Sequence, residues 1–271
     1  MEPIKYVDAL NNKYGSMGFP PYQWSENDTA PWTPLTKPLT ECTVALLVSG
    51  GISHCTAAPF DPDARNDHRV DAIDPGEAMD QYQIHDSYYD HADADRDLNC
   101  LFPVDRLAEL AELGEIGAVA NRHWSGFMGR TYNRSKVLNE SAPAFVEQLK
   151  ADGVDLLIAI PALPLDHQTV GLVSRVVEES GIPTVNVSTG RDITALVRPP
   201  RSLFVNFPMG NTFGRAGDNV MQTKILRAAL DFIVTAEEPG VLVDLPLKWD
   251  DDFVYFAGET TPEAVAKQMK K

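Results

Sequence analysis

Continuous apolar runs alternate along this chain with segments of helical periodicity. The run Thr43–Ser49 is apolar on both faces and is closed by Gly50-Gly51, a pattern typical of a central parallel strand. Later runs predict further strands at Gly117–Ala120, Val154–Ile160, Thr184–Val187, Leu203–Asn206 and, at an edge, Val241–Leu245. The alternation predicts an α/β fold: a doubly wound, mainly parallel sheet with helices on both faces.

Helices are predicted where apolar residues recur three and four positions apart. In Pro103–Leu113 the proline suits the first helical position, Leu107 and Leu110 share a face, and Gly114 suits the C-terminal stop. The other predicted helices are Ala142–Ala151, Gln168–Glu179, Asn219–Val234 and Pro262–Met269.

The pattern divides the chain into three parts. Residues 1–40 form an irregular, aromatic-rich arm, in which Tyr22, Trp24 and Trp32 are predicted to pack on the main body or on a partner subunit. Residues 41–235 form an α/β catalytic-type domain, and residues 236–271 add an edge strand and a helix. A long polar insert, residues 52–101, follows the first strand, and a structureless connection of this length is often functional.

Composition excludes several classes of protein. A net charge of −16 over 271 residues repels nucleic acid, and no apolar run is long enough to span a bilayer. The first residues lack the pattern of a signal peptide, so we expect a cytoplasmic protein. Cys42, Cys55 and Cys100 form no Cys-x-x-Cys pair. No dinucleotide fingerprint or Walker lysine accompanies Gly50-Gly51, so no nucleotide cofactor is expected.

Residues 85–99 concentrate the polar chemistry of the insert. They contain two His, five Asp, two Tyr and one Asn, with Leu98 as the only aliphatic side chain larger than alanine. Such a composition cannot form a packed core. It is either a solvated acidic loop or part of a site that offers imidazole and carboxylate ligands.

Polar residues also follow the predicted strands, and ligands bind beyond the carboxyl ends of strands in open α/β sheets. The predicted metal ligands, for a divalent ion such as Zn or Fe, are His54, His85, His91 and Asp95. The predicted catalytic residues are Asp166, His167, His123 and Cys55. The predicted substrate-binding residues are Arg191, Tyr89, Ser53 and Asn206, with Arg191 suited to a substrate carboxylate.

Several motifs resemble one known family. They are Val44–Gly51 followed by Ala58–Asp61, Tyr89–Asn99 running into Phe102–Leu107, Gly114–Gly117, Gly153–Ile160 with His167–Leu172, Gly181–Val185, and Pro199–Arg201 with Phe207–Gly210. Together they resemble the selenoprotein B subunits of the glycine, sarcosine, betaine and D-proline reductases over roughly residues 40–235. The resemblance implies chemistry on a small amino acid or amine.

The chain departs from this family in the loop where the reductases have redox-active selenocysteine or cysteine. The corresponding loop, residues 161–167, contains no cysteine, and the resemblance places Leu163 and Asp166 at the cysteine positions. Thiolates and selenolates are the nucleophiles of this reductive chemistry. The resemblance therefore implies that the scaffold is kept and its redox element is lost.

Three hypotheses follow. The first is a metal-assisted enzyme on this scaffold, with a lyase or hydrolase reaction as one form of it. The second is a thiol-dependent reductase subunit of the family type that uses Cys55 or a partner's thiol. The third is a non-catalytic subunit that binds a small ligand or builds a complex. In each case we expect a homo-oligomer formed through the N-terminal arm.

Overall fold

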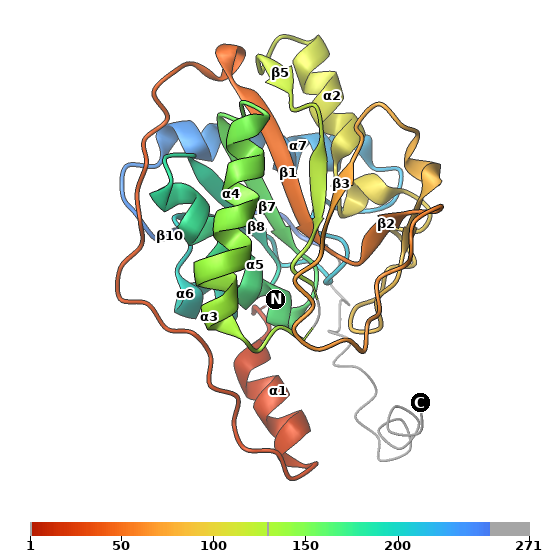
Figure 1. The fold of residues 1–271 in the computed structure, drawn as a ribbon, viewed down its shortest axis with the longest axis vertical. Helices are drawn as coiled ribbons and strands as arrows, with labels where there is room; N and C mark the ends of the chain where they lie inside the picture. Colours follow the sequence, from red (N-terminus) through yellow and green to blue (C-terminus); the bar gives the residue numbers. More distant parts are fainter. Residues whose placement is uncertain (1, 129, 250–271) are drawn as a thin grey trace.

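The computed structural model describes residues 2–128 and 130–249 and contains the predicted sheet (Figure 1). The central strand β1 (Thr43–Ser49) lies between β7 (Leu156–Pro161) and β6 (His123–Gly126), in the order β10-β9-β8-β7-β1-β6-β3. The other parallel strands are β5 (Ala118–Val119), which also pairs with β1, β8 (Thr184–Ser188), β9 (Arg201–Phe204) and β10 (Val241–Asp244). Strand β3 (Val70–Ile73) is antiparallel to β6. The α/β class is confirmed.

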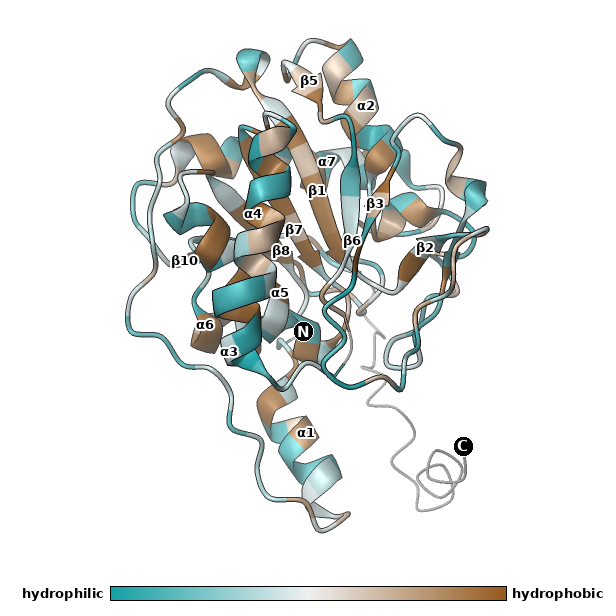
Figure 2. Cartoon of the chain, viewed as in Figure 1, coloured by the Kyte–Doolittle hydropathy of each residue, from teal (hydrophilic) through white to brown (hydrophobic). Residues whose placement is uncertain are grey.

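Burial on both faces makes β1 the centre of the core. It pairs with β7 from Val44↔Leu156 to Ser49↔Pro161, and six of its seven residues are buried. Figure 2 shows these strands as the hydrophobic interior and polar positions on the outer surfaces of the covering helices. Apolar side chains on both faces are what a parallel sheet covered on both sides requires.

Helices cover both faces of the sheet (Figure 1). On one side lie α4 (Ala142–Ala151), α5 (Pro164–Glu179) and α6 (Arg191–Val197), and behind the sheet lie α2 (Val104–Glu112) and α7 (Asn219–Thr235). The short helix α3 (Arg134–Lys136) and a π-helical turn, Val137–Ser141, precede α4. Helix α5 begins four residues before its predicted start, because Pro164 occupies the first turn.

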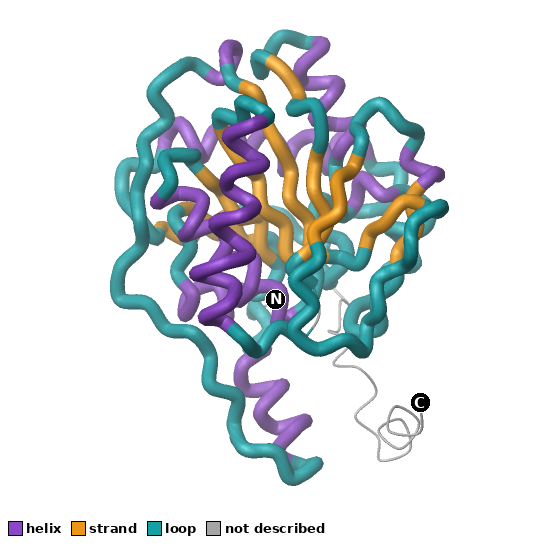
Figure 3. The backbone as a smooth tube through the Cα atoms, viewed as in Figure 1, coloured by secondary structure: helices purple, strands orange, loops and turns teal. Residues whose placement is uncertain are grey.

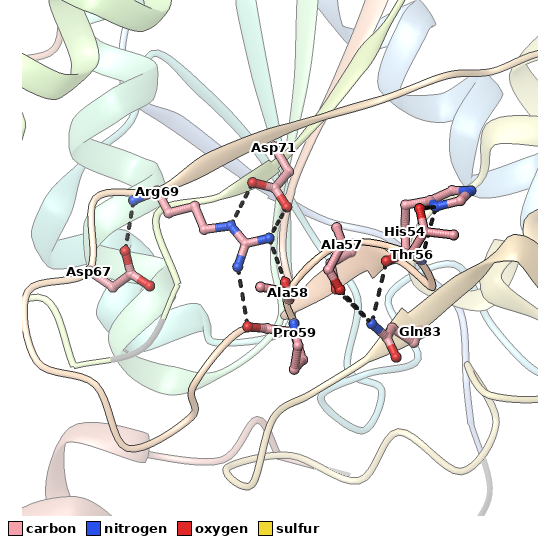
Figure 4. A network of polar contacts seen from close by, with 10 residues as sticks. His54, Thr56, Ala57, Ala58, Pro59, Asp67, Arg69, Asp71 and Gln83 are labelled. Carbon is pink, nitrogen blue, oxygen red and sulfur yellow. Dashed lines mark hydrogen bonds and ion pairs between the residues drawn. The ribbon is translucent and has the colours of Figure 1, made fainter.

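The polar insert is more ordered than its sequence predicts. Besides β3, it contains the antiparallel pair β2 (Ile52–His54) and β4 (Tyr82–Ile84), with 3₁₀ turns at Met79–Gln81 and Leu98–Cys100. In Figure 4 the Arg69 guanidinium donates to the Asp71 carboxylate and to the carbonyl oxygens of Ala58 and Pro59. The Gln83 amide donates to backbone carbonyls of the same loop. Polar contacts therefore organise a segment that has few apolar residues.

The arm is only partly irregular. Residues Tyr6–Gly15 form helix α1, which the sequence analysis missed because its apolar periodicity is weak. The chain then runs as a long loop along the outside of α5 and α6 (Figure 3) and reaches β1 through a 3₁₀ turn, Leu39–Glu41. The Ser25 N–H donates to Gln168 and the Thr33 N–H donates to Glu178, so this loop packs on its own body.

The predicted strand Gly117–Ala120 places His123 in a loop beyond a strand, but His123–Gly126 is itself strand β6, and this part of the prediction is wrong. The predicted helix Pro262–Met269 lies outside the described residues. Among the helices of the described chain, none combines the length and the apolar character that crossing a membrane requires.

Candidate functional site

The candidate site lies where β1 and β7 end, at the carboxyl edge of the sheet. The Tyr89 hydroxyl donates to the Gly50 carbonyl at 2.7 Å and fixes the polar insert over the end of β1. A β-carbon at Gly50 would lie 3.1 Å from the Tyr89 hydroxyl and 3.0 Å from Leu101. Glycine therefore permits the close approach of the insert to the strand end.

Two carboxylates lie near the Tyr89 phenol. Burial raises the pKa of Tyr89 well above its ordinary value, and the charges of Asp86 and Asp166 raise it further. Asp166 is fully buried in the first turn of α5, where the helix dipole favours an acidic side chain. We call Asp86, Tyr89 and Asp166 the Tyr89 cluster.

Burial strongly perturbs the Asp86 carboxylate of this cluster. Its side chain is 8% exposed, and burial raises its pKa to about 6, against hydrogen bonds from Tyr88 and Ser87 that lower it. The Tyr88 N–H donates to Oδ1 at 2.6 Å, whereas Oδ2 is buried and has no hydrogen-bond partner within residues 2–128 and 130–249. A buried acceptor left in this state destabilises the fold unless a ligand or a bound water molecule supplies a donor.

Two neighbouring groups add unsatisfied polar atoms at the same edge. Ser49, the last residue of β1, has a buried hydroxyl without a hydrogen-bond partner in the described chain. The His85 N–H donates to the Gly51 carbonyl at 2.9 Å, and its buried Nδ1 also has no partner among these residues. Ser49, which precedes Gly50, and His85 and Asp86, which follow strand β4, thus each have one buried side-chain atom without a hydrogen-bond partner in the described chain.

His167 is bonded within the fold at both ring nitrogens. Its Nδ1 donates to the Leu163 carbonyl at 2.7 Å, and its Nε2 accepts from the Thr189 N–H at 3.2 Å. Burial lowers the pKa of His167 to about 4, so the ring is neutral near pH 7. These contacts hold the start of α5 against the end of β8, so His167 has a structural role.

His123 lies away from the carboxyl edge, contrary to its predicted place. It opens strand β6, where its Nδ1 accepts from the Leu46 N–H at 3.2 Å. Burial lowers its pKa to about 3, and the Phe102 ring lies edge-on at 5.9 Å. The prediction placed it in a loop because β6 was not recognised as a strand.

The four predicted metal ligands do not form one site. His91 and Asp95 form a pair at 2.7 Å, whereas His54 contacts Thr56 at 2.6 Å and Glu77 at 3.4 Å. Within the described residues, no group of three or more His, Cys, Asp and Glu side chains is placed to hold a metal ion. The shared His54–His85–His91–Asp95 site is therefore not formed by this structure.

The other predicted residues have separate positions. Arg191, which opens α6, pairs with Asp244 on β10 at 2.8 Å. Ser53 is buried in β2, and Cys55 is exposed on the turn that follows this strand. Asn206 is half-buried just beyond β9. Of the twelve predicted site residues, Tyr89, Asp166 and His85 lie at the candidate site.

Other aspartates of residues 85–99 hold the surrounding loops. The Asp97 carboxylate accepts from the Gly217 N–H and from the Gln222 amide, each at 2.7 Å, and Asp93 accepts from Asn211 at 2.8 Å. Residues 85–99 therefore both stabilise the surrounding loops and contribute side chains to the candidate site. The sequence analysis missed Asp86 and Ser49, although the adjacent Tyr88-Tyr89 pair marks where the segment becomes buried.

Comparison with known proteins places the chain in one family. Residues 7–161 match the family model described as glycine/sarcosine/betaine reductase selenoprotein B. The chain belongs to this family. It is 32% identical over 219 residues to the D-proline reductase subunit gamma of Acetoanaerobium sticklandii, covering 80% of this chain and 89% of that subunit.

Longer relatives match over part of their length. The sarcosine reductase complex component B subunit beta of Peptoclostridium acidaminophilum is 25% identical over 244 residues, 84% of this chain and 54% of the relative. The glycine reductase complex component B subunit gamma of the same organism is 29% identical over 160 residues, 57% of this chain and 35% of the relative. No solved structure matches the chain. The match to the family model thus includes β1 and β7 and ends at the start of the loop at residues 161–167.

Proposed function

We propose that this chain is the small-molecule-binding subunit of a reductase-type enzyme complex, and that its substrate is a small amino acid or amine bound at the Tyr89 cluster. One observation supports this proposal above all: Asp86 Oδ2 is buried at the carboxyl edge without a donor from the described chain. A substrate ammonium group supplies such a donor together with the opposite charge.

The chemistry of the cluster favours a cation with N–H groups. Asp86 and Asp166 both act electrostatically on Tyr89, so a ligand near this phenol meets two carboxylates in a partly desolvated setting. Charge-assisted hydrogen bonds are strongest in such a setting. The unsatisfied Ser49 hydroxyl and His85 Nδ1 offer further polar contacts to the rest of a small ligand.

The electron donor is proposed to lie outside the loop at residues 161–167. Burial raises the pKa of the Cys100 thiol, Cys42 is also buried, and Cys55 is exposed. Buried thiols with raised pKa values are poor nucleophiles. A partner subunit's thiol or selenol is therefore the proposed reductant, with Cys55 as the candidate within this chain. The names of the relatives, subunits of reductase complexes, support a complex of this kind.

Three sequence predictions concern metal binding, the type of reaction and the oligomeric state. Metal analysis of the purified protein tests whether a divalent ion binds. Product analysis tests a lyase or hydrolase reaction. The oligomeric state of the purified chain tests self-association.

Titration calorimetry with glycine, sarcosine, betaine and D-proline tests the proposed binding site. We expect at least one compound bearing an N–H cation to bind. Asp86→Asn removes the charge and keeps the shape, and should weaken that binding at least about tenfold. The matched control is Asp90→Asn, since Asp90 is exposed and its carboxylate accepts a hydrogen bond from the Ala92 N–H in the same segment.

Two results would overturn the proposal: none of the four compounds binds, or Asp86→Asn binds as tightly as the unchanged chain. Activity assays then separate the electron donors. If Cys55→Ser abolishes reduction and an added thiol partner does not restore it, the donor lies in this chain. Binding without turnover in the presence of thiols and metals favours a subunit that only binds its ligand.

A further inference from the structure

His91 lies on the solvent side of the Tyr89 cluster. Its ring centroid is 5.8 Å from that of Tyr89, and the two rings meet edge-on. The His91 side chain is 29% exposed, whereas Tyr89 is buried. Burial is the main cause of the raised pKa of Asp86, and the charge of His91 acts against it, so these two side chains are close enough to interact electrostatically. A ligand bound at Asp86 therefore has His91 as its neighbour toward solvent.

A backbone turn and one carboxylate orient the His91 ring. The Asp95 N–H donates to the His91 carbonyl at 2.8 Å, which brings side chains four positions apart onto one face. The His91 Nδ1 then lies 2.7 Å from the Asp95 carboxylate. An ionised carboxylate only accepts hydrogen bonds, so in the neutral ring Nδ1 carries the proton and Nε2 offers a lone pair. Nε2 is therefore the acceptor of this ring.

The turn at residues 91–95 is anchored to the loop that follows β9. The Asp93 carboxylate accepts from the Asn211 amide at 2.8 Å. A β-carbon at Gly210 would overlap the Asp90 carbonyl oxygen, so this loop packs directly against the start of the turn. A side chain that contacts a ligand is most effective when supporting contacts of this kind fix its orientation in advance.

We propose that His91 Nε2 accepts a second hydrogen bond from the substrate's ammonium group, beside the one that Asp86 Oδ2 accepts. This inference rests on the proposed function and narrows its substrate class to cations with at least two N–H groups, which are primary and secondary amines. A tertiary ammonium group has one N–H and leaves one acceptor unsatisfied, and a quaternary one leaves both unsatisfied. Hydrogen bonds from charged donors are stronger than neutral ones, so each loss lowers affinity measurably.

Titration calorimetry with compounds that differ only in N-methylation tests this inference. Glycine, sarcosine, N,N-dimethylglycine and betaine form one series, in which each methyl group replaces one N–H, and D-proline and N-methyl-D-proline form a second. We expect sarcosine to bind at least about tenfold more tightly than N,N-dimethylglycine, or D-proline at least about tenfold more tightly than N-methyl-D-proline. The measurements are made at about pH 8, above the ordinary titration range of imidazole.

His91→Phe removes the acceptor and keeps an aromatic ring next to Tyr89. It should reduce the preference for two N–H groups to within about threefold in the pair that binds. The matched control is His54→Phe, because the His54 ring also lies edge-on to a tyrosine, Tyr82 at 5.5 Å, and its Nδ1 is also bonded, to Thr56 (Figure 4). His54→Phe should keep the full preference. Circular dichroism establishes that each variant is folded.

Substitutions of Asp95 test its role as a positioning residue. In Asp95→Asn the amide donates to Nδ1, which moves the ring proton to Nε2 and leaves no acceptor there. This variant should also lower the preference for two N–H groups, whereas Asp95→Glu, which keeps a carboxylate, should retain it. A purely structural role would instead weaken the binding of both members of a pair equally.

Three outcomes would contradict this inference. An undiminished preference in His91→Phe overturns the inference alone, because it shows that the added methyl group acts through its bulk. Equal binding of both members of a pair by the unchanged chain also overturns it and leaves the proposed function intact. If no compound of either series binds, the inference and the proposed function fail together.

Discussion

Asp86 and Glu178 are both buried carboxylates whose pKa values are raised mainly by burial, yet their surroundings differ. Both Glu178 oxygens accept hydrogen bonds. Oε1 accepts from the Arg201 guanidinium at 2.7 Å and from the Thr33 N–H at 2.6 Å, and Oε2 accepts from the Thr184 N–H at 2.7 Å. Asp86 has one oxygen without a partner in the described chain. A fully bonded buried carboxylate belongs to the fold, whereas an unsatisfied one costs stability and suits a binding site.

The largest effect on the free energy of unfolding is expected from breaking the buried Arg201–Glu178 ion pair. Arg201 and Glu178 are both fully buried, and Arg201 also stacks on Trp32 of the arm. Arg201→Met leaves the Glu178 charge without its partner, and should lower the free energy of unfolding by about 3–5 kcal/mol in urea denaturation. The double variant Glu178→Gln/Arg201→Met should lose less. Equal losses in the single and double variants would show that the ion pair is not the cause.

Removing the charge of Asp86 should instead increase the free energy of unfolding. The pKa of Asp86 rises from 3.8 to about 6 on folding, so its contribution to stability is full below pH 3.8 and is lost as the pH rises through about 6. At pH 8, Asp86→Asn should therefore raise the free energy of unfolding by about 2 kcal/mol. Denaturation at pH 4 is the control, because the gain should largely vanish there. A loss of stability at pH 8 would contradict the comparison.

Tyr89→Phe should have a smaller effect on both stability and ligand affinity. It removes one hydrogen bond, from the hydroxyl to Gly50, and should cost about 1 kcal/mol. The insert keeps its other contacts, so ligand affinity should fall less than in Asp86→Asn. Calorimetry on both variants checks this order, and the reverse order would make Tyr89 the principal ligand contact.

The smallest effect on stability and ligand affinity is expected from substituting Arg191. Its pair with Asp244 is exposed on both sides, so Arg191→Ala should cost less than about 1 kcal/mol of unfolding free energy. Ligand affinity should stay within about twofold of the wild-type value. A tenfold loss of affinity would instead support the sequence prediction that Arg191 binds a substrate carboxylate.

The sequence predicted the parts of the fold that apolar periodicity determines. Thr43–Ser49 and Ala142–Ala151 have the same bounds in the structure as in the prediction. Strand β6 was missed because it contains His123, Trp124 and Ser125, whose polar atoms suggest a loop. Helix α1 was missed because its apolar periodicity is weak, and only one of its residues is buried.

The site was predicted less well for a physical reason. Residue type does not reveal which polar atoms are satisfied: His167 and Asp86 both suggest chemistry, but only Asp86 retains an unbonded atom in the described chain. Two hydrogen bonds, one that His167 donates to the Leu163 carbonyl and one that it accepts from the Thr189 N–H, decide the role of His167. Such partners become visible only in three dimensions.

The pKa of the Asp86 carboxyl group, measured by carbon-13 NMR titration with and without the bound amine, tests the central claim most directly. Assignment is made by comparison with Asp86→Asn. We predict a pKa of about 6 in the free chain and a lower value in the complex, because the ligand's cation stabilises the charged form. A value near 3.8 in the free chain, or a pKa that the bound ligand leaves unchanged, would contradict it.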